Sequence, residues 1–485
     1  MKGPPTSPNH LPSSSNLAFT QFPTDFTQLP TVSFVIPNQE HDMHDGTGRM
    51  GDDWLRDNLN AYAVWARAHN SLLIITWDED DYEGDNRILT VFHGANLRNG
   101  TVVEGTWTHH NLLRMLEDMY DLPTHAGAAA QVRPIIGPFA SDPVVKRTLF
   151  RQGLNSYTNA SDTMLWQQHA GTNHARSLNL TVDLDTSTAA GNQVGQALVR
   201  FENIIGNSLN QVPQTATIHS AKLLPQTPRN TTGFDFASYD RFRLHRMLIR
   251  WDDTDTWSSL VGGVSLNDIE ARLSPTVSLV PSVDGGTAIF DVTADIELFG
   301  VGTPNRGWVI SPPSSSYGDG WTFKSSETPS SLAQRPTLEV LYSLPPNPYE
   351  RWASALGLTG PDSQPNADPD RDGADNLAEF AYNLDPRLAD AHPVTPMGTN
   401  GLPAARVVSG ALDNLFEVQF LRRKGPSPAG LAYAVEFSGD LMEWSAGQTP
   451  VVTSLGEDWE SVAVRDVAPN SNLSRFARVS VTLQP

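Results

Sequence analysis

The spacing of hydrophobic residues changes along the chain, and the first part combines strand-like and helix-like stretches. Residues 1–30 are rich in Pro, Ser, Thr and Asn and show no period, which predicts an irregular surface segment. Continuous apolar runs at residues 32–36 and 71–77 predict two buried strands, and residues 53–69 carry apolar positions at helical spacing between them. This order of strand, helix and strand predicts a parallel pair with a right-handed crossover.

A third strand at residues 87–92 and a helix at residues 111–120 continue this alternation. Strands that alternate with helices are typical of α/β folds. We therefore expect a partial α/β domain at residues 1–141.

The helical period fades after Pro138, and short alternating stretches separated by Gly, Pro, Asn and Asp clusters follow as far as Tyr342. Regularly spaced strands and turns predict an all-β sandwich at residues 142–345. The expected strands are residues 197–201, 215–223, 242–249, 287–292, 308–310 and 337–342.

The last part of the chain combines a short helical module with a second β region. A proline-rich linker at residues 344–348 leads into an acidic helical module at residues 346–392. Residues 393–485 alternate again, notably at 416–420, 433–437 and 476–481, which predicts a second β-sandwich. The expected fold class is therefore multidomain, with a partial α/β domain followed by two all-β sandwiches that a short helical module joins.

Composition narrows the possible partners. A chain of 485 residues is long enough for several domains, and 54 acidic against 33 basic residues give a formal charge of -21. Such a charge repels nucleic acid and anionic membrane surfaces and favours divalent cations. The absence of cysteine excludes disulfides, zinc ribbons and thiol catalysis, and no apolar run is long enough to span a membrane. No apolar stretch like a signal peptide is present, so we expect either a cytosolic protein or a sequence that starts downstream of the natural N-terminus.

The strongest chemical signal is a calcium-binding loop at residues 368–379, which fits the pattern D-x-[DN]-x-[DN]-G-x5-E at every fixed position. A calcium ion takes six to eight oxygen ligands, which the loop supplies as carboxylates, a backbone carbonyl and a bidentate glutamate, with Gly373 at the sharp turn. The predicted ligands are Asp368, Asp370, Asp372, the carbonyl of Ala374, Asn376 and Glu379.

Helical patterns at residues 349–358 and 376–383 flank this loop. The alternative is a solvated acidic linker that only matches the pattern, although four carboxylates without an ion would repel one another. The region resembles short calcium-binding modules related to dockerin and thrombospondin type 3 repeats, which precede C-terminal β-domains of secreted bacterial proteins. Because calcium is abundant outside cells, the loop favours a secreted, extracellular protein.

A second candidate site follows the two apolar runs of the α/β domain. The first run leads into residues 37–46, which contain Glu40, His41, His44 and Asp45, and the second leads into residues 78–81. In open α/β sheets ligands bind beyond the carboxyl ends of strands, so imidazoles and carboxylates would converge there as a metal or phosphate site. The alternative is a pair of solvated polar loops.

These residues also resemble a family. The resembling segments are residues 36–38, 41–46, 76–81 with Asn86, 108–109 and 113–120. In residue types and order they are similar to the C-terminal half of the bacterial acid phosphatase and phospholipase C-type phosphoesterase family, and the resemblance spans residues 10–137. This family belongs to the alkaline phosphatase superfamily. The resemblance implies hydrolysis of phosphate esters by a metal-assisted hydroxyl nucleophile.

The resemblance implies that Asp78 and Glu79 bind a divalent metal of unknown identity, that His44 lies near the phosphate, and that His109 is a further catalytic candidate. A metal can polarise a phosphoryl oxygen, and an imidazole can protonate the leaving oxygen. The resemblance also implies that the nucleophile and further metal ligands belong to the family's N-terminal half. We therefore expect a truncated phosphoesterase without turnover of its own; the alternative is a non-catalytic extracellular carbohydrate-binding or adhesion protein.

The β regions resemble accessory modules of secreted bacterial proteins. Residues 142–345 resemble a DNRLRE-type β-sandwich, through residues 198–201, 216–223, 290–293 and 307–310, and residues 393–485 resemble a common C-terminal β-domain. Exposed tryptophans could stack on polysaccharide, but we expect Trp257, Trp308 and Trp321 to lie in the core, because aromatic residues dominate sandwich interiors.

Overall fold

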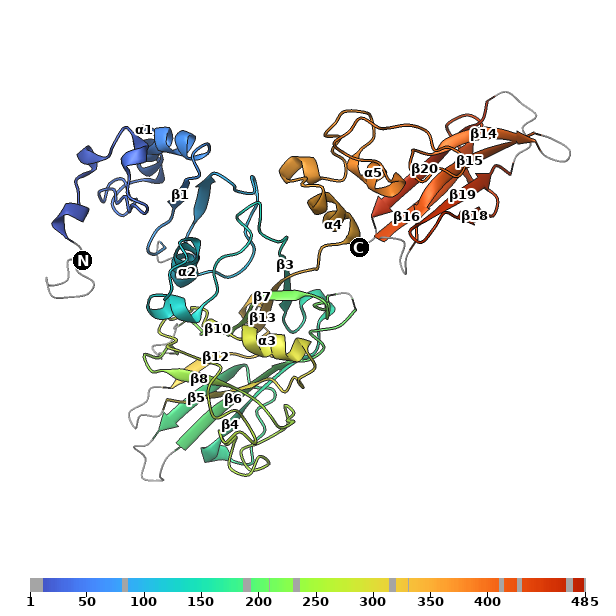
Figure 1. Cartoon of the computed structure of the whole chain (residues 1–485). Coiled ribbons are helices and arrows are strands. Elements are labelled where there is room, and N and C mark those ends of the chain that lie inside the picture. The colour runs from blue at the N-terminus through green and yellow to red at the C-terminus, as the bar shows by residue number, and fades with distance from the viewer. Residues whose placement is uncertain are drawn as a thin grey trace. The chain divides into compact units, whose positions relative to one another are not determined.

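The computed structural model describes residues 12–80, 86–185, 193–208, 210–229, 236–313, 320–329, 331–409, 414–424, 430–467 and 474–483. The chain divides into two compact units, Met1–Ser343 and Leu344–Pro485. Strands predominate in both units (Figure 1). The protein is therefore multidomain and mostly β, as the alternating stretches predict.

The N-terminal part of the first unit contains two helices and a small sheet. Its elements are α1 (Gly48–Ala66), β1 (Leu72–Ile75), β2 (Val91–Gly94) and α2 (His109–Met119). Thr47 caps α1 by accepting a hydrogen bond from the backbone N–H of Met50. The two strands pair in antiparallel register, with Leu72 opposite Gly94.

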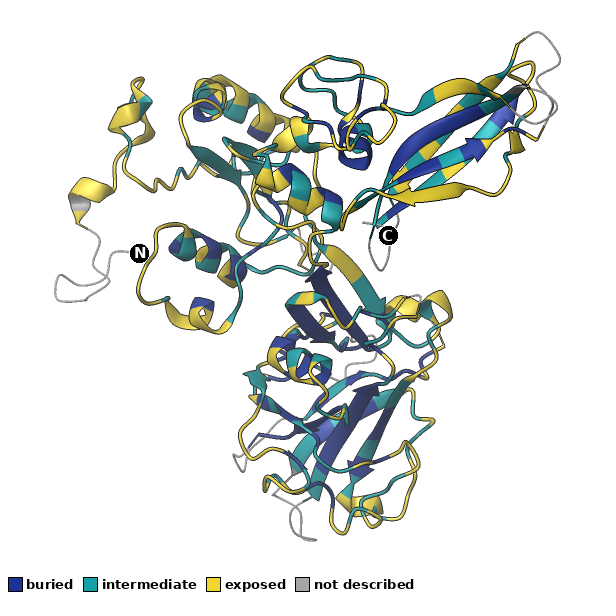
Figure 2. Ribbon diagram, turned by 45° about the vertical axis from the view of Figure 1, so that its right-hand side comes forward, coloured by how far each residue is buried: buried dark blue, intermediate teal, exposed yellow. Residues whose placement is uncertain are grey.

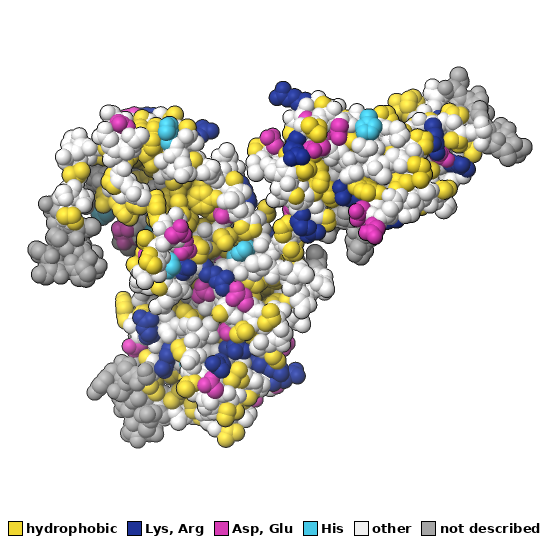
Figure 3. All heavy atoms as spheres, viewed as in Figure 1, with side chains coloured by type: hydrophobic (Ala, Val, Ile, Leu, Met, Phe, Trp, Pro, Cys, Tyr) yellow, Lys and Arg dark blue, Asp and Glu magenta, His cyan; other side chains and the backbone are white. Residues whose placement is uncertain are grey.

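The predicted parallel pair is wrong. Residues 32–36 form no strand, and Phe34 and Ile36 are each 83% exposed. A hydrophobic run forms a strand only where a neighbouring strand accepts and donates its backbone hydrogen bonds, and in the described residues β1 pairs with β2 alone. In Figure 3 hydrophobic side chains gather on the surface of this part of the chain.

Residues 146–343 form a β-sandwich. Its elements are β3 (Lys146–Phe150), β4 (Ala160–Trp166), β5 (Asn179–Asp185), β6 (Gln193–Phe201), β7 (Thr217–Leu224), β8 (Phe242–Arg246), β9 (Val277–Leu279), β10 (Phe290–Asp291), α3 (Thr293–Gly300), β11 (Trp308–Ser311), β12 (Trp321–Lys324) and β13 (Thr337–Ser343). One sheet has the order β10-β7-β13-β3, and the other has the order β12-β5-β6-β11-β8-β9, with β4 also paired to β6. Buried residues of both sheets form the core (Figure 2).

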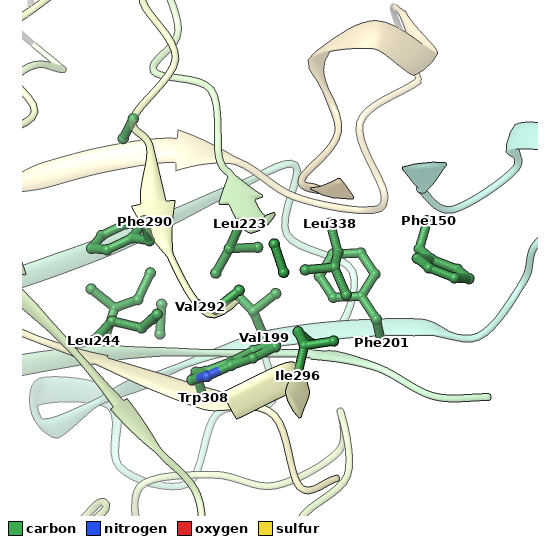
Figure 4. Packing of buried hydrophobic residues seen from close by; sticks show 14 of the residues in the cluster. Phe150, Val199, Phe201, Leu223, Leu244, Phe290, Val292, Ile296, Trp308 and Leu338 are labelled. Carbon is green, nitrogen blue, oxygen red and sulfur yellow. The ribbon is translucent and has the colours of Figure 1, made fainter. Parts of the chain in front are cut away.

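The sandwich interior is aromatic, as expected from the sequence. Leu223 and Leu338 of one sheet lie opposite Val199 and Trp308 of the other (Figure 4). Trp308 and Trp321 are fully buried, which confirms that they belong to the core. Trp257 is partly buried and packs on a smaller hydrophobic cluster.

Helix α3 is an element that the sequence pattern did not indicate. It is short, and its residue types do not follow its burial: the polar Thr293 and Asp295 are buried, whereas Leu298 is 39% exposed, so no helical period marks it in the sequence. Its Asp295 accepts a hydrogen bond from Trp308 Nε1 at 2.7 Å and lies 3.0 Å from Arg246 Nε. These contacts fix the helix to strands β11 and β8.

A buried polar network joins the N-terminal part to the sandwich. Glu339 of β13 is 1% exposed, and its carboxylate accepts hydrogen bonds from the backbone N–H of Thr106 and from Arg147 Nε, each at 2.8 Å. Lys222 of β7 donates to the Thr106 carbonyl and lies 4.9 Å from the Trp107 ring centroid. The segment that leads into α2 is therefore held against the sandwich.

In its described residues the second unit contains two α-helices and seven strands. Its elements are α4 (Pro348–Ala355), α5 (Asn376–Tyr382), β14 (Ala404–Ser409), β15 (Asn414–Arg423), β16 (Leu431–Ser438), β17 (Ser445–Ala446), β18 (Val451–Ser454), β19 (Trp459–Arg465) and β20 (Phe476–Leu483). The sheets have the orders β14-β15-β19-β18 and β17-β16-β20. Tyr349 of α4 and Phe380 of α5 share one core with the strands, so the helices and the β-sandwich form a single packed body.

Candidate functional site

Three polar segments meet in the N-terminal part of the first unit. Trp77 Nε1 donates a hydrogen bond to the Asp42 carbonyl at 2.9 Å, which joins the segment after β1 to the loop before α1. His109 Nε2 lies 3.2 Å from the Asp78 carbonyl oxygen, which joins the same segment to the start of α2. The structure therefore brings together loops that the sequence predicts to share one site.

His44 lies in a compact turn of this site. Asp42 Oδ1 accepts the backbone N–H of His44 at 2.8 Å, and His44 Nδ1 lies 3.1 Å from Asp45 Oδ1. The hydrogen bond and charge of Asp45 raise the pKa of His44, with smaller contributions from Asp42 and Glu79. This imidazole is therefore disposed to carry positive charge, which suits contact with a phosphate.

The predicted metal ligands do not form a complete coordination set. Asp78, Glu79, His44 and His109 are all exposed. Among the described residues, no group of three or more acidic or histidine side chains around Asp78 brings its ligand atoms within 4.8 Å of one another. Asp81, which the sequence places in the same run, lies outside the described residues. The ligand roles of Asp78 and Glu79 therefore stay predictions.

The site lies within a segment that other proteins share. Residues 4–123 match the Phosphoesterase family. The chain is also 49% identical over 129 residues to the phosphatidylinositol-3-phosphatase of Mycobacterium tuberculosis (strain ATCC 25618 / H37Rv). This similarity supports the phosphoesterase resemblance of the N-terminal part.

The similarity has clear bounds. It covers 26% of this chain and 42% of the mycobacterial protein, so the chain spans about two-fifths of that relative. The matched region ends before the β-sandwich of residues 146–343. No helix in the described part of the chain is long and apolar enough to cross a membrane.

The calcium-type loop lies in the second unit, between α4 and α5. The side chain of Asp368 accepts backbone N–H groups of Arg371 at 2.7 Å and of Gly373 at 3.1 Å. Asp372 Oδ1 accepts the N–H of Ala374 at 2.9 Å. Gly373 has a φ of 95°, a conformation that favours glycine. The loop is therefore folded back on its own carboxylates, as the spacing predicts.

Carboxylates converge inside this loop. The ligand atoms of Asp368, Asp370 and Asp372 lie within 4.8 Å of one another, and so do those of Asp372, Glu379 and Asp390. Glu379 is 0% exposed, and neither of its side-chain oxygens has a hydrogen-bond partner among the described residues. Burial and the charges of the neighbouring carboxylates raise the pKa of Glu379 to about 8. A divalent cation would neutralise this repulsion.

Asn376 contributes mainly to the shape of the site. Its Nδ2 donates to the carbonyl oxygens of Asp362 at 2.7 Å and Gln364 at 2.8 Å. Its Oδ1 is buried and has no hydrogen-bond partner in the described residues, so this oxygen stays a candidate ligand. Asp390 could not be found from the sequence, because it lies outside the calcium motif and has no fixed spacing to it.

Proposed function

We propose that the chain is a secreted phosphoesterase-type protein whose N-terminal part recognises a phosphate ester and whose second unit binds calcium. The proposal that the N-terminal part recognises a phosphate ester rests on one observation. Residues 42–44, 77–79 and 109 meet within the segment that is similar to a phosphatidylinositol-3-phosphatase. His44 supplies positive charge toward the phosphate, and His109 lies at the start of α2 beside Asp78.

We propose further that hydrolysis depends on residues beyond those of the described site. The exposed Asp78 and Glu79 have no convergent third ligand in the described residues. The exposed run at residues 32–36 also has no partner strand there, which supports a domain that is completed by further strands. A phosphatidylinositol phosphate is one candidate substrate, on the strength of the relative's name.

A fragment-complementation assay tests this proposal. The full chain alone is expected to show no hydrolysis of p-nitrophenyl phosphate with Mg²⁺, Mn²⁺, Zn²⁺ or Ca²⁺. Addition of the part of the mycobacterial phosphatase that lies outside the alignment is expected to produce metal-dependent hydrolysis. D78N should reduce that hydrolysis by about 100-fold, because a ligand is lost.

The matched control is D52N, which removes one exposed carboxylate from α1 in the same part of the chain. It should leave the rate of the complemented mixture unchanged. Hydrolysis by the chain alone that disappears in D78N would contradict the need for further residues. A mixture that stays inactive would count against the assignment of the site.

The proposal for the second unit is that the loop at residues 368–379 binds calcium and stabilises the fold. The buried, unpartnered carboxylate of Glu379 supports it. Export follows from the same argument, because millimolar calcium outside cells would keep a site of moderate affinity occupied.

A further inference from the structure

Asp390 lies beside the calcium loop in space although it lies outside the loop in sequence. Its ligand atom is within 4.8 Å of those of Asp372 and Glu379, and Asp372 also belongs to the group formed with Asp368 and Asp370. Because the two groups share Asp372, they adjoin each other at that side chain. Asp390 alone among these carboxylates comes from the segment after α5.

Several oxygens at this location are buried without a hydrogen-bond partner in the described residues. They are both side-chain oxygens of Glu379, Asp370 Oδ2 and Asp390 Oδ1. Burying anionic oxygens without donors is strongly unfavourable, so folded proteins rarely leave them unpaired. A divalent cation bound beside Asp372 would supply positive charge to these oxygens, whereas a hydrogen-bond donor would satisfy one or two of them.

Backbone contacts hold Asp390 at this location. Asp390 Oδ2 accepts the backbone N–H of Asp385 at 3.3 Å, and Asp372 Oδ2 accepts the N–H of Ala391 at 2.6 Å. The chain turns back after α5 at Asn383, whose φ of 60° is a helix-ending left-handed conformation. The fold therefore returns residues 385–391 to the loop by contacts that involve no ion.

We propose that Asp390 is a calcium ligand supplied from outside the twelve-residue loop; this inference rests on the proposed calcium site at residues 368–379. One oxygen from each aspartate, the Ala374 carbonyl and two oxygens from Glu379 make about seven donors, within the six to eight that calcium accepts. The donors are Asp368, Asp370, Asp372, Ala374, Glu379 and Asp390.

The additional ligand gives the ion a wider structural effect. Val394 follows shortly after Asp390, belongs to the core of the second unit and donates its N–H to the Leu402 carbonyl at 2.8 Å. Phe380 of α5 belongs to the same core. An ion bound by both Glu379 and Asp390 therefore holds two separate segments, helix α5 and the segment that leads to Val394, against one core. Calcium then stabilises the β-sandwich as well as the loop.

Terbium luminescence tests the ligand role directly, because lifetimes in H2O and D2O report the number of water molecules on the bound ion. We compare the full wild-type chain with D390A, which removes both side-chain oxygens of Asp390. D390A is expected to carry about one more bound water than wild type and to lower calcium affinity in calorimetry by about tenfold or more. D362N, which removes an exposed carboxylate nearby, should match wild type in both measurements.

The outcomes separate the two proposals. If wild type and D362N bind calcium and D390A has the same hydration number and affinity, Asp390 is not a ligand and the loop site stands. If wild type binds no calcium, the loop site itself is wrong and this inference falls with it. D390A that keeps the metal-free far-ultraviolet circular dichroism of wild type but binds terbium more weakly supports the ligand role.

Discussion

E379Q is expected to destabilise the second unit in calcium and to stabilise it in a chelator. In calcium at 100 times the dissociation constant, wild type gains about 2.7 kcal/mol of unfolding free energy from the bound ion. Loss of the glutamate ligand should remove most of this gain. Without calcium, Glu379 has no hydrogen-bond partner among the described residues, and its pKa of about 8 makes ionisation in the folded state unfavourable, so replacement by a neutral amide should raise the free energy of unfolding by about 1 to 3 kcal/mol.

The measurement is chemical denaturation of the full chain with and without calcium, with hydrogen exchange in α5 and β15 to locate the change in the second unit. D362N is the control, because it removes a nearby exposed carboxylate and should behave as wild type under both conditions. Equal destabilisation of E379Q in calcium and in chelator would show that Glu379 contributes packing alone.

E339A is expected to destabilise the first unit by about 3 to 5 kcal/mol, because it leaves buried cationic and amide donors unpaired. Glu339 accepts hydrogen bonds from Thr106 and Arg147, and Lys222 lies in the same network. Since residues 106–107 lead into α2, hydrogen exchange should also rise at the start of α2 near His109. Urea denaturation of the full chain and hydrogen exchange at residues 104–110 measure the two effects.

The matched comparison is E104Q. Glu104 is half-exposed and lies 3.4 Å from the same Arg147, so its loss should change the free energy of unfolding by less than about 1 kcal/mol. If E339A were no more destabilising than E104Q, the buried network would not hold the N-terminal part against the sandwich.

Elements with a clear local period could be predicted from sequence. Strands β6, β7, β11 and β13 lie where the alternation of residue types indicates, and helices α1, α2, α4 and α5 overlap their expected ranges. The short helix α3 could not be predicted, because it has polar residues on its buried face and Leu298 on its exposed face, so its residue types show no helical period. Residues 32–36 have the composition of a strand, but their exposure shows that composition does not supply a pairing partner.

Of the two candidate sites, one could be located from sequence and the other could be predicted only in part. The loop at residues 368–379 could be located from sequence because its predicted ligands lie within one short segment with fixed spacing. A parallel sheet was expected to bring together residues 37–46 and 78–81, and the family resemblance added His109. The structure joins these segments around an antiparallel pair. The sequence therefore identified the polar residues by their chemistry, but it did not predict the geometry that connects them.

The sequence by itself determined the acidic character of the chain, the predominance of β structure, the position of the calcium-type loop and the similarity of the N-terminal part to phosphoesterases. The tertiary structure alone decided that β1 pairs with β2, that Glu339 holds Thr106 across 233 residues, and that Asp390 joins the loop. Local patterns record which conformation a segment favours. Contacts between distant segments depend on which surfaces remain to be buried and which charges remain to be paired once those segments have formed.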